Sequence, residues 1–259
     1  MTTAHNDAVR EQFRGQAATF TDDGWAARGL AWIVERLRPE PHEQALDVAA
    51  GAAHLGRALA PHLRHVTALD LTPEMLRQGQ RLADAAGVRN VAFALGDAAA
   101  LAWLDDQFDL VVCRLAVHQV ADPVAMVAEM VRVTRPGGRI GITDMVVDDD
   151  PVSASEANRL ERLRDPSHGR THTIAEIQAL LRAAGAEITE VVTRDHPLDL
   201  EDWLERTATP PGDREEIRTR LRAELDGGPP TGLRPHREAD DTLTFVHAWA
   251  TIVATPPTM

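Results

Sequence analysis

Three aspartates, Asp47, Asp70 and Asp97, lie in or just after three short apolar runs at 45–48, 66–70 and 91–95. Asp70 follows Asp47 by 23 positions, close to the spacing of about 20 at which an acidic residue reaches the ribose hydroxyls of a nucleotide. A carboxylate suits this task because its two oxygens accept two hydrogen bonds. The spacing indicates a nucleotide site, although Asp47 could instead cap a turn and Asp97 could begin a helix.

A turn of small residues, Ala49 to Ala53, follows the first apolar run, and from His54 apolar residues recur at helical spacing. This pattern predicts a strand, a tight turn and a helix. Gly51 would let the backbone approach a ligand closely, and a helix N-terminus offers free N–H groups. The Gly-x-Gly-x-x-Gly spacing of dinucleotide sites is absent, so an ordinary strand-to-helix turn remains an alternative.

His118 is the candidate catalytic residue among the 11 histidines, in the stretch LAVHQVADP just after a fourth apolar run. An imidazole can remove a proton near neutral pH, and the chain has no tyrosine to do the same work. The alternative is a histidine that bonds to backbone at the start of a helix. His168 and Arg170, in the turn RDPSHGR, could contact an anionic substrate or simply stabilise that turn.

Alternating strands and helices must position these residues. Apolar runs predict strands at 45–48, 66–70, 91–95, 108–113, 139–145, 186–193 and 242–255. Helical patterns predict helices that include 7–20, 25–37, 122–134, 155–164, 173–184, 198–207 and 214–225. Such alternation implies an α/β fold with a mostly parallel sheet, whose ligands bind beyond the carboxyl ends of the strands.

Five motifs in order carry a family resemblance: LDVAAGAAH, ALDLTPEML, GDAAAL, FDLVVCRLAVHQVADP and RVTRPGGRI. With them, the chain resembles class I S-adenosylmethionine (SAM)-dependent methyltransferases of the small-molecule type, near the ubiquinone/menaquinone-biosynthesis branch. The resemblance covers nearly the whole chain. It implies a doubly wound, mostly parallel, seven-stranded Rossmann-like sheet with a closing antiparallel strand and an N-terminal helical lid.

The same resemblance implies SAM as the cofactor. It assigns cofactor contacts to Asp47, Ala49, Gly51, Asp70, Leu71, Asp97, Ala98 and Arg114, with Phe20 over the site and Gln16 as a further lid candidate. Asp47 and its turn would face the methionine end, Asp70 the ribose and Asp97 the adenine. The family usually has glycine where Ala49 and Ala53 stand, so Gly51 alone remains of three.

The organisation implied is one methyltransferase-like domain over 1–259. Its expected parts are a helical lid (1–40), a SAM-binding core (41–147), substrate-side insertions (148–172 and 196–241) and the closing strand (242–255). Asp148 to Asp150 could suggest a magnesium site, but adjacent carboxylates on a loop are expected to be solvated, so no metal is predicted.

Composition limits the partners. The formal net charge of −13 disfavours nucleic acid and anionic lipid. The sequence has no apolar run of membrane-spanning length, its N-terminus lacks an apolar signal core, and its single cysteine, Cys113, suits a reducing compartment. We therefore expect a cytoplasmic protein with a small-molecule partner, and a homodimer is left open.

The leading hypothesis is methyl transfer to O, C or N of a small organic acceptor. A non-methyl reaction such as cyclisation, a binding module without turnover, and an NAD(P)-dependent oxidoreductase remain as alternatives. The oxidoreductase would share the argument from Asp70 but not the motifs GDAAAL and RVTRPGGRI.

Overall fold

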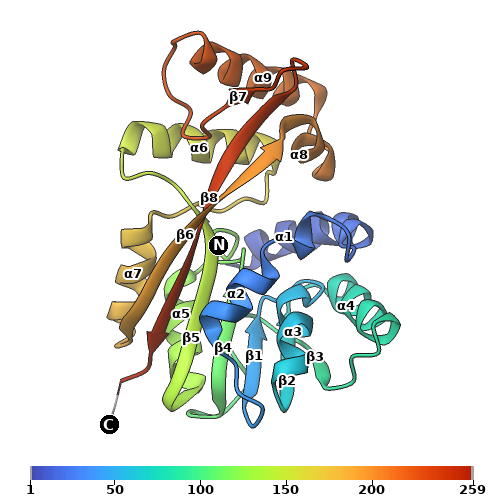
Figure 1. Ribbon diagram of the computed structural model, residues 1–259, viewed down its shortest axis with the longest axis vertical. Coiled ribbons are helices and arrows are strands. Elements are labelled where there is room, and N and C mark those ends of the chain that lie inside the picture. The colour runs from blue at the N-terminus through green and yellow to red at the C-terminus, as the bar shows by residue number, and fades with distance from the viewer. Residues whose placement is uncertain (1, 258–259) are drawn as a thin grey trace.

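One mixed sheet organises the chain (Figure 1). The computed structural model describes residues 2–257, without the side chains of 2 and 3. The strands are β1 (Gln44–Val48), β2 (His65–Asp70), β3 (Val91–Leu95), β4 (Phe108–Arg114), β5 (Thr134–Val146), β6 (Glu187–Asp199), β7 (His236–Arg237) and β8 (Leu243–Thr255). Their order is β3-β2-β1-β4-β5-β8-β6, and β7 pairs with β8.

The strand directions confirm the predicted fold. β3, β2, β1, β4 and β5 pair in parallel, whereas β8 runs antiparallel to both β5 and β6. The two-residue strand β7 is an addition to the seven predicted strands, and it lies within the predicted insertion at 196–241. β7 adds a second partner to the N-terminal end of β8, so the seven predicted strands form the main path of an eight-stranded sheet.

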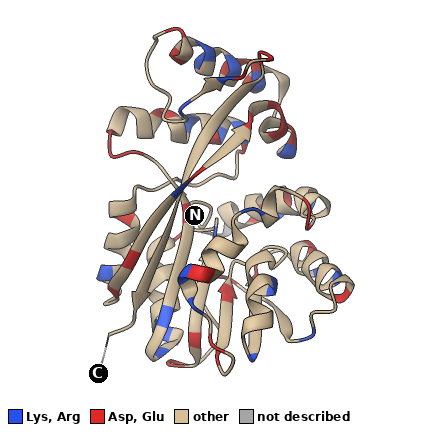
Figure 2. Cartoon of the chain, viewed as in Figure 1, with Lys and Arg blue, Asp and Glu red and all other residues tan. Residues whose placement is uncertain are grey.

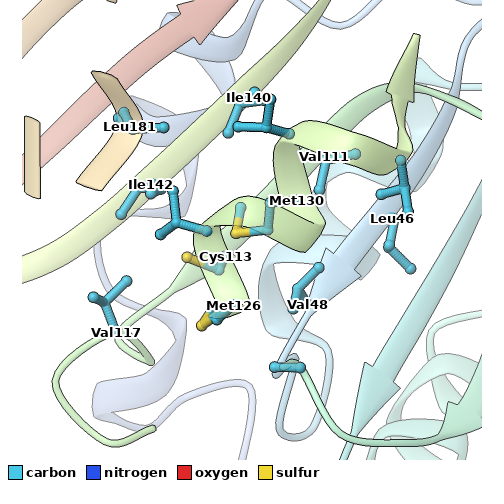
Figure 3. Close-up of a cluster of buried hydrophobic side chains, with 14 of the residues drawn as sticks. Leu46, Val48, Val111, Cys113, Val117, Met126, Met130, Ile140, Ile142 and Leu181 are labelled. Atoms are coloured by element: carbon cyan, nitrogen blue, oxygen red, sulfur yellow. The ribbon is translucent and has the colours of Figure 1, made fainter. Parts of the chain in front are cut away.

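Helices cover both faces of the sheet. They are α1 (Thr2–Gln16), α2 (Leu30–Leu37), α3 (His54–Leu59), α4 (Pro73–Ala85), α5 (Pro123–Val133), α6 (Pro151–Arg164), α7 (Ile174–Ala183), α8 (Leu200–Arg206) and α9 (Pro211–Leu225). α5 and α7 bury one face with Met126, Met130 and Leu181 (Figure 3), and α2 and α3 bury the other with Ile33 and Leu59. Strands buried on both faces explain the unbroken apolar runs of the sequence.

A helical lobe surrounds the extended ends of β6 and β8 (Figure 1). α6, α8 and α9 contribute to a separate apolar cluster that includes Leu160, Trp203, Ile217 and Phe245. Trp203 and Phe245 meet edge to face, with ring centroids 4.8 Å apart. The segments predicted as insertions at 148–172 and 196–241 supply most of this lobe, so they have a core of their own.

The N-terminal helices differ from the prediction. α1 ends at Gln16 rather than continuing to Phe20, and short 3-10 turns (η1, Ala17–Thr19; η2, Trp25–Ala27) follow it. The second predicted helix, 25–37, begins only at Leu30. Gly29 interrupts it with φ = 74°, in the left-handed region, which a continuous helix cannot accommodate.

The starts of the helices are capped in different ways. Thr173 and Glu176 form a capping box at the start of α7. Thr72 precedes α4, but its side chain makes no capping bond, and its backbone N–H donates to Asp70. Asp150 caps α6 by accepting from the Ser153 N–H at 2.8 Å.

Charged residues lie mainly on the outer helices and loops, and the strands carry few of them (Figure 2). No helix within 2–257 is long and apolar enough to cross a membrane.

Candidate functional site

A cavity opens at the carboxyl ends of β1, β2 and β4, and it continues under α1 and into the helical lobe. The ten residues predicted as cofactor contacts or catalytic base all line it: Phe20, Asp47, Ala49, Gly51, Asp70, Leu71, Asp97, Ala98, Arg114 and His118. The parallel strands account for this convergence, because their carboxyl ends share one edge of the sheet.

Asp70 is fixed at the end of β2 by two backbone donors. The Gly51 N–H donates to Asp70 Oδ2 at 2.7 Å, and the Thr72 N–H donates to Asp70 Oδ1 at 2.8 Å. Burial raises the pKa of Asp70, although these N–H groups oppose the rise. Each carboxylate oxygen has further acceptor capacity, so the side chain is held in one orientation and can still bind a ligand.

Asp47 caps its turn, as the structural alternative predicted, and retains a free oxygen. The Gly56 N–H donates to Asp47 Oδ2 at 2.8 Å, whereas Oδ1 is buried without a hydrogen-bond partner among the described residues. Burial raises the pKa of Asp47 to about 7, against the Gly56 hydrogen bond and the charge of Arg114. An unpaired buried oxygen is costly, and a cationic ligand group would remove that cost.

Several buried donors without a hydrogen-bond partner in the described part of the chain line the same cavity, and two of them belong to the N-terminal segment. Gln16 Nε2 and Trp25 Nε1 have no hydrogen-bond partner among residues 2–257. Together with Asp47 Oδ1 they form a set of two donors and one acceptor. This set fits the carboxylate and the ammonium of an amino-acid group, the groups at the methionine end of SAM.

Asp97 holds the turn after β3. The Ala99 N–H donates to Asp97 Oδ1 at 2.9 Å, and Asn6 Nδ2 donates to Asp97 Oδ2 at 2.9 Å. The alternative of a helix N-cap is thus replaced by a side-chain-stabilised turn, since no helix begins there. Asn6 lies on α1, so Asp97 also ties the N-terminal helix to the cavity.

The first turn has a left-handed backbone at three alternate residues. Ala49, Gly51 and Ala53 have φ values of 53°, 56° and 54°. A Cβ at Gly51 would lie 3.1 Å from Met75 Cε. The left-handed conformation costs an L-residue about 1–2 kcal/mol. Ala49 and Ala53 therefore hold, with some strain, the shape that glycine adopts more readily.

The N-terminal segment is anchored over the cavity. Phe20 is buried against Trp25, with ring centroids 5.2 Å apart. Arg114 Nη1 donates to the Ala26 carbonyl at 2.8 Å, and Nη2 donates to the Arg28 carbonyl at 2.9 Å. Burial lowers the pKa of Arg114 to about 10. The resemblance assigned Arg114 a cofactor contact, and its side chain also secures the segment that covers the site.

His118 forms a pair with Asp144, a residue that the sequence reasoning missed. His118 Nδ1 lies 2.5 Å from Asp144 Oδ1, and the His118 N–H donates to Asp144 Oδ2 at 3.1 Å. Burial lowers the pKa of His118, but the charge and hydrogen bond of Asp144 outweigh this effect and leave the pKa raised. The sequence signal that could have identified Asp144 was the presence of an acidic residue within the apolar run that forms β5.

The lobe side of the cavity was also missed, apart from His168. It is lined by Glu161 and Arg164 of α6, Asp165, Trp203 and Arg206 of α8, and His247 and Trp249 of β8. His168 stacks on His118 with ring centroids 5.4 Å apart, and burial lowers its pKa to about 4. Arg170 does not line the cavity and instead pairs with Glu176 at 2.5 Å. The charge patterns of α6 and α8 gave no sequence signal for these residues, because charged side chains are typical of any solvent-exposed helix face.

None of the described His, Cys, Asp and Glu side chains form a group of three or more that could hold a metal ion.

Residues 45–138 match the pattern of a methyltransferase domain family. The chain is 32% identical over 211 residues to the uncharacterized methyltransferase YcgJ of Bacillus subtilis, covering 81% of this chain and 83% of YcgJ. It is 33% identical over 121 residues to a demethylmenaquinone methyltransferase of Renibacterium salmoninarum, covering 47% of this chain and 49% of that protein.

Two solved structures extend the similarity beyond the matched domain. The YcgJ crystal structure has a TM-score of 0.80 at 28% identity, covering 89% of this chain and 98% of that chain. A candidate methyltransferase of Bacillus halodurans has a TM-score of 0.81 at 26% identity, covering 89% and 99%. Sequence, sheet order and these relatives agree, and the chain belongs to the class I SAM-dependent methyltransferases.

Proposed function

We propose that the protein transfers a methyl group from SAM to O, C or N of a small organic acceptor. The observation that carries this proposal is one cavity that joins three strand-end carboxylates to the His118–Asp144 pair. The carboxylates suit a nucleoside with an amino-acid tail, and the histidine suits an acceptor that must lose a proton. SAM supplies a methyl group activated by a sulfonium.

Each cofactor contact has a stated chemical reason. Asp70 would accept from the ribose hydroxyls, and Asp97 with the Ala98 amide would bind the adenine edge. Asp47 Oδ1 would accept from the ammonium, with the Ala49–Gly51 turn close to the methionine end. The side chains that would enclose the cofactor are Leu71, Phe20 and Arg114, all of which line the cavity.

His118 would act as the general base. Asp144 accepts from the Nδ1–H, which leaves Nε2 of the neutral ring free to take the proton that the acceptor loses on methylation. A positioned base of this kind contributes about 10²–10⁴ in rate. The rest of the acceleration would come from holding acceptor and methyl donor in line.

The remaining parts of the chain would shape the acceptor site. We assign the lid role to 1–40 and the substrate side to 148–172 and 196–241, because α1 and the helical lobe line the cavity opposite the strand ends. The buried, free thiol of Cys113 suits the reducing cytoplasm. No described contact favours cyclisation or a binding module over methyl transfer.

Calorimetry with SAM, S-adenosylhomocysteine and NAD(H) tests the proposal directly. We expect the first two to bind, and Asp70→Ala to weaken their binding by about 2–3 kcal/mol, since hydrogen bonds to a charged group are lost. Asp84→Ala, an exposed change near the end of α4, is the matched control. Binding of NAD(H) alone, or equal SAM affinity in the Asp70 variant and the native protein, would contradict the assigned site.

A further inference from the structure

The cavity extends from His118 into the helical lobe, where two arginines line it. Arg164 of α6 is engaged by its neighbours. Its Nε donates to the Trp203 carbonyl at 3.1 Å, and its Nη1 donates to Glu161 Oε2 at 3.4 Å. Its guanidinium also lies over the Trp203 ring, 4.7 Å from the centroid. Arg164 therefore has a counter-ion and a fixed position.

Arg206 of α8 forms no close ion pair with a carboxylate of the described residues, although the more distant charges of Glu161 and Asp202 favour its cationic form. Its side-chain hydrogen bond runs from Nε to the carbonyl of Asp202 at 3.3 Å. The guanidinium lies over the Trp25 ring, 4.9 Å from the centroid. Burial and the charge of Arg164 lower the pKa of Arg206 to about 10, so the side chain stays cationic near neutral pH. A half-buried cation that no carboxylate pairs with directly is suited to an anionic ligand.

The carboxylates on this side of the cavity have other partners. Glu161 lies between Arg164 and His247, whose Nε2 is 3.0 Å from Glu161 Oε1. Asp165 Oδ1 accepts from the N–H of Ser167 at 2.8 Å and from its hydroxyl at 2.7 Å. Both acids line the cavity, so they would repel a dianion. A ligand with a single negative charge, bound by the guanidinium of Arg206 alone, is the better match.

The walls near Arg206 are apolar and aromatic. Arg206 lies over Trp25, and Trp203 and Leu198 line the same cavity. Trp25 comes from the N-terminal segment and Trp203 from the lobe, so both parts of the chain contribute aromatic surface to this cavity. A flat apolar body would gain most from contact with this surface, because aromatic rings provide large contact areas of fixed shape.

We infer that the methyl acceptor is an aromatic or flat apolar carboxylic acid whose carboxylate is bound by Arg206. This inference rests on the proposed function and names its substrate class. Arg206 and His118 come from different elements that line one cavity, so an acceptor whose carboxylate is bound at Arg206 lies in the cavity that His118 also lines. The guanidinium fork matches a carboxylate with two parallel hydrogen bonds.

Matched carboxylates and amides test this inference. Calorimetry would compare indole-3-acetate with indole-3-acetamide, and benzoate with benzamide, each with and without S-adenosylhomocysteine. The native protein should bind at least one acid about tenfold or more tightly than its amide, as expected for a charge-assisted pair. Arg206→Met keeps the apolar stem and should abolish this preference, whereas Arg206→Lys should retain part of it.

Arg222→Met removes an exposed arginine of α9 outside the cavity and should leave the preference unchanged. Native protein that binds no acid better than its amide, or an equal preference in Arg206→Met, overturns the inference. S-adenosylhomocysteine binding is read separately in the same protein. Its absence would count against the proposed function, while the acid and amide titrations without it still decide the role of Arg206.

Discussion

The two sides of the cavity are built differently. On the strand side, backbone N–H groups of neighbouring turns hold the carboxylates, as Gly51 and Thr72 do for Asp70. On the lobe side, side chains from distant segments hold one another, as Glu161 of α6 and His247 of β8 do. The first arrangement follows from the topology of a parallel sheet. The second depends on how the insertions pack.

This difference suggests a division of labour within the proposed function. A backbone-anchored half suits a cofactor that the whole family shares, because its geometry survives changes in the lobe. A half made from side-chain pairs can change its ligand by a few substitutions, since each pair joins side chains of separate elements, as Glu161 of α6 and His247 of β8 do. His118 lies where the two halves meet.

The largest expected effect is on chemistry at this junction. His118→Gln keeps hydrogen bonding but cannot titrate, so turnover with an identified acceptor should fall by about 10²–10⁴. SAM affinity should change little, because the strand side is intact. Turnover within about threefold of native, with the same pH profile, would make His118 a structural residue and leave positioning as the mechanism.

The next effect concerns the buried carboxyl of the strand side. Folding raises the pKa of Asp47 from 3.8 to about 7, so between these values the folded protein binds a proton that the unfolded chain releases. Stability without ligand should therefore fall as pH rises through this window, by up to about 4 kcal/mol. Asp47→Asn should remove this contribution, so its stability relative to the native protein should be greater at pH 8 than at pH 4.

Chemical denaturation of both proteins across pH 4–8 measures the difference. A stability difference that does not change with pH would mean that Asp47 ionises as freely in the folded chain as in the unfolded one. SAM binding supplies the second readout, because the neutral amide of the Asp47→Asn variant lacks the negative charge that Asp47 offers to the ammonium. We therefore expect Asp47→Asn to bind SAM more weakly than the native protein does.

Much of the strand side could be predicted from the sequence, because apolar runs locate the strands and the residues after them converge at one edge. Asp70 and Asp97 are examples. The lobe side could not be predicted in this way. Arg206 resembles any charged residue of an exposed helix until tertiary packing places it over Trp25, and Asp144 shows its role only through contact with His118. The break at Gly29 comes from its left-handed backbone, which the apolar periodicity of 25–37 does not reveal.

A smaller effect separates the orientation of His118 from its chemistry. Asp144 raises the pKa of His118, and a base must be deprotonated, so turnover should rise with pH along a limb that lies above the usual histidine value. Asp144→Asn removes the charge and should move this limb to lower pH while lowering turnover by about tenfold to a hundredfold, as loss of an orienting hydrogen bond does. If the pH at which turnover rises were the same in Asp144→Asn as in the native protein, the group that titrates there would not be His118.

The smallest expected effects come from replacing left-handed alanines with glycine, in the first turn and in the lobe. Ala49, Ala53 and Ala208 have φ values of 53°, 54° and 51°, but Ala53 is fully buried and Ala208, in the lobe, is exposed. Glycine relieves about 1–2 kcal/mol of left-handed strain at each position and loses about 0.4–1 kcal/mol through the unfolded chain. At Ala53 it also loses a buried methyl worth about 0.8 kcal/mol. Denaturation should therefore show Ala208→Gly stabilised by about 0.5–1 kcal/mol and Ala53→Gly near zero, with Ala49→Gly between them.

Ala53→Gly should also keep SAM affinity within about tenfold. If only Ala53→Gly bound SAM and the native chain did not, the alanine turn would have cost the protein its cofactor.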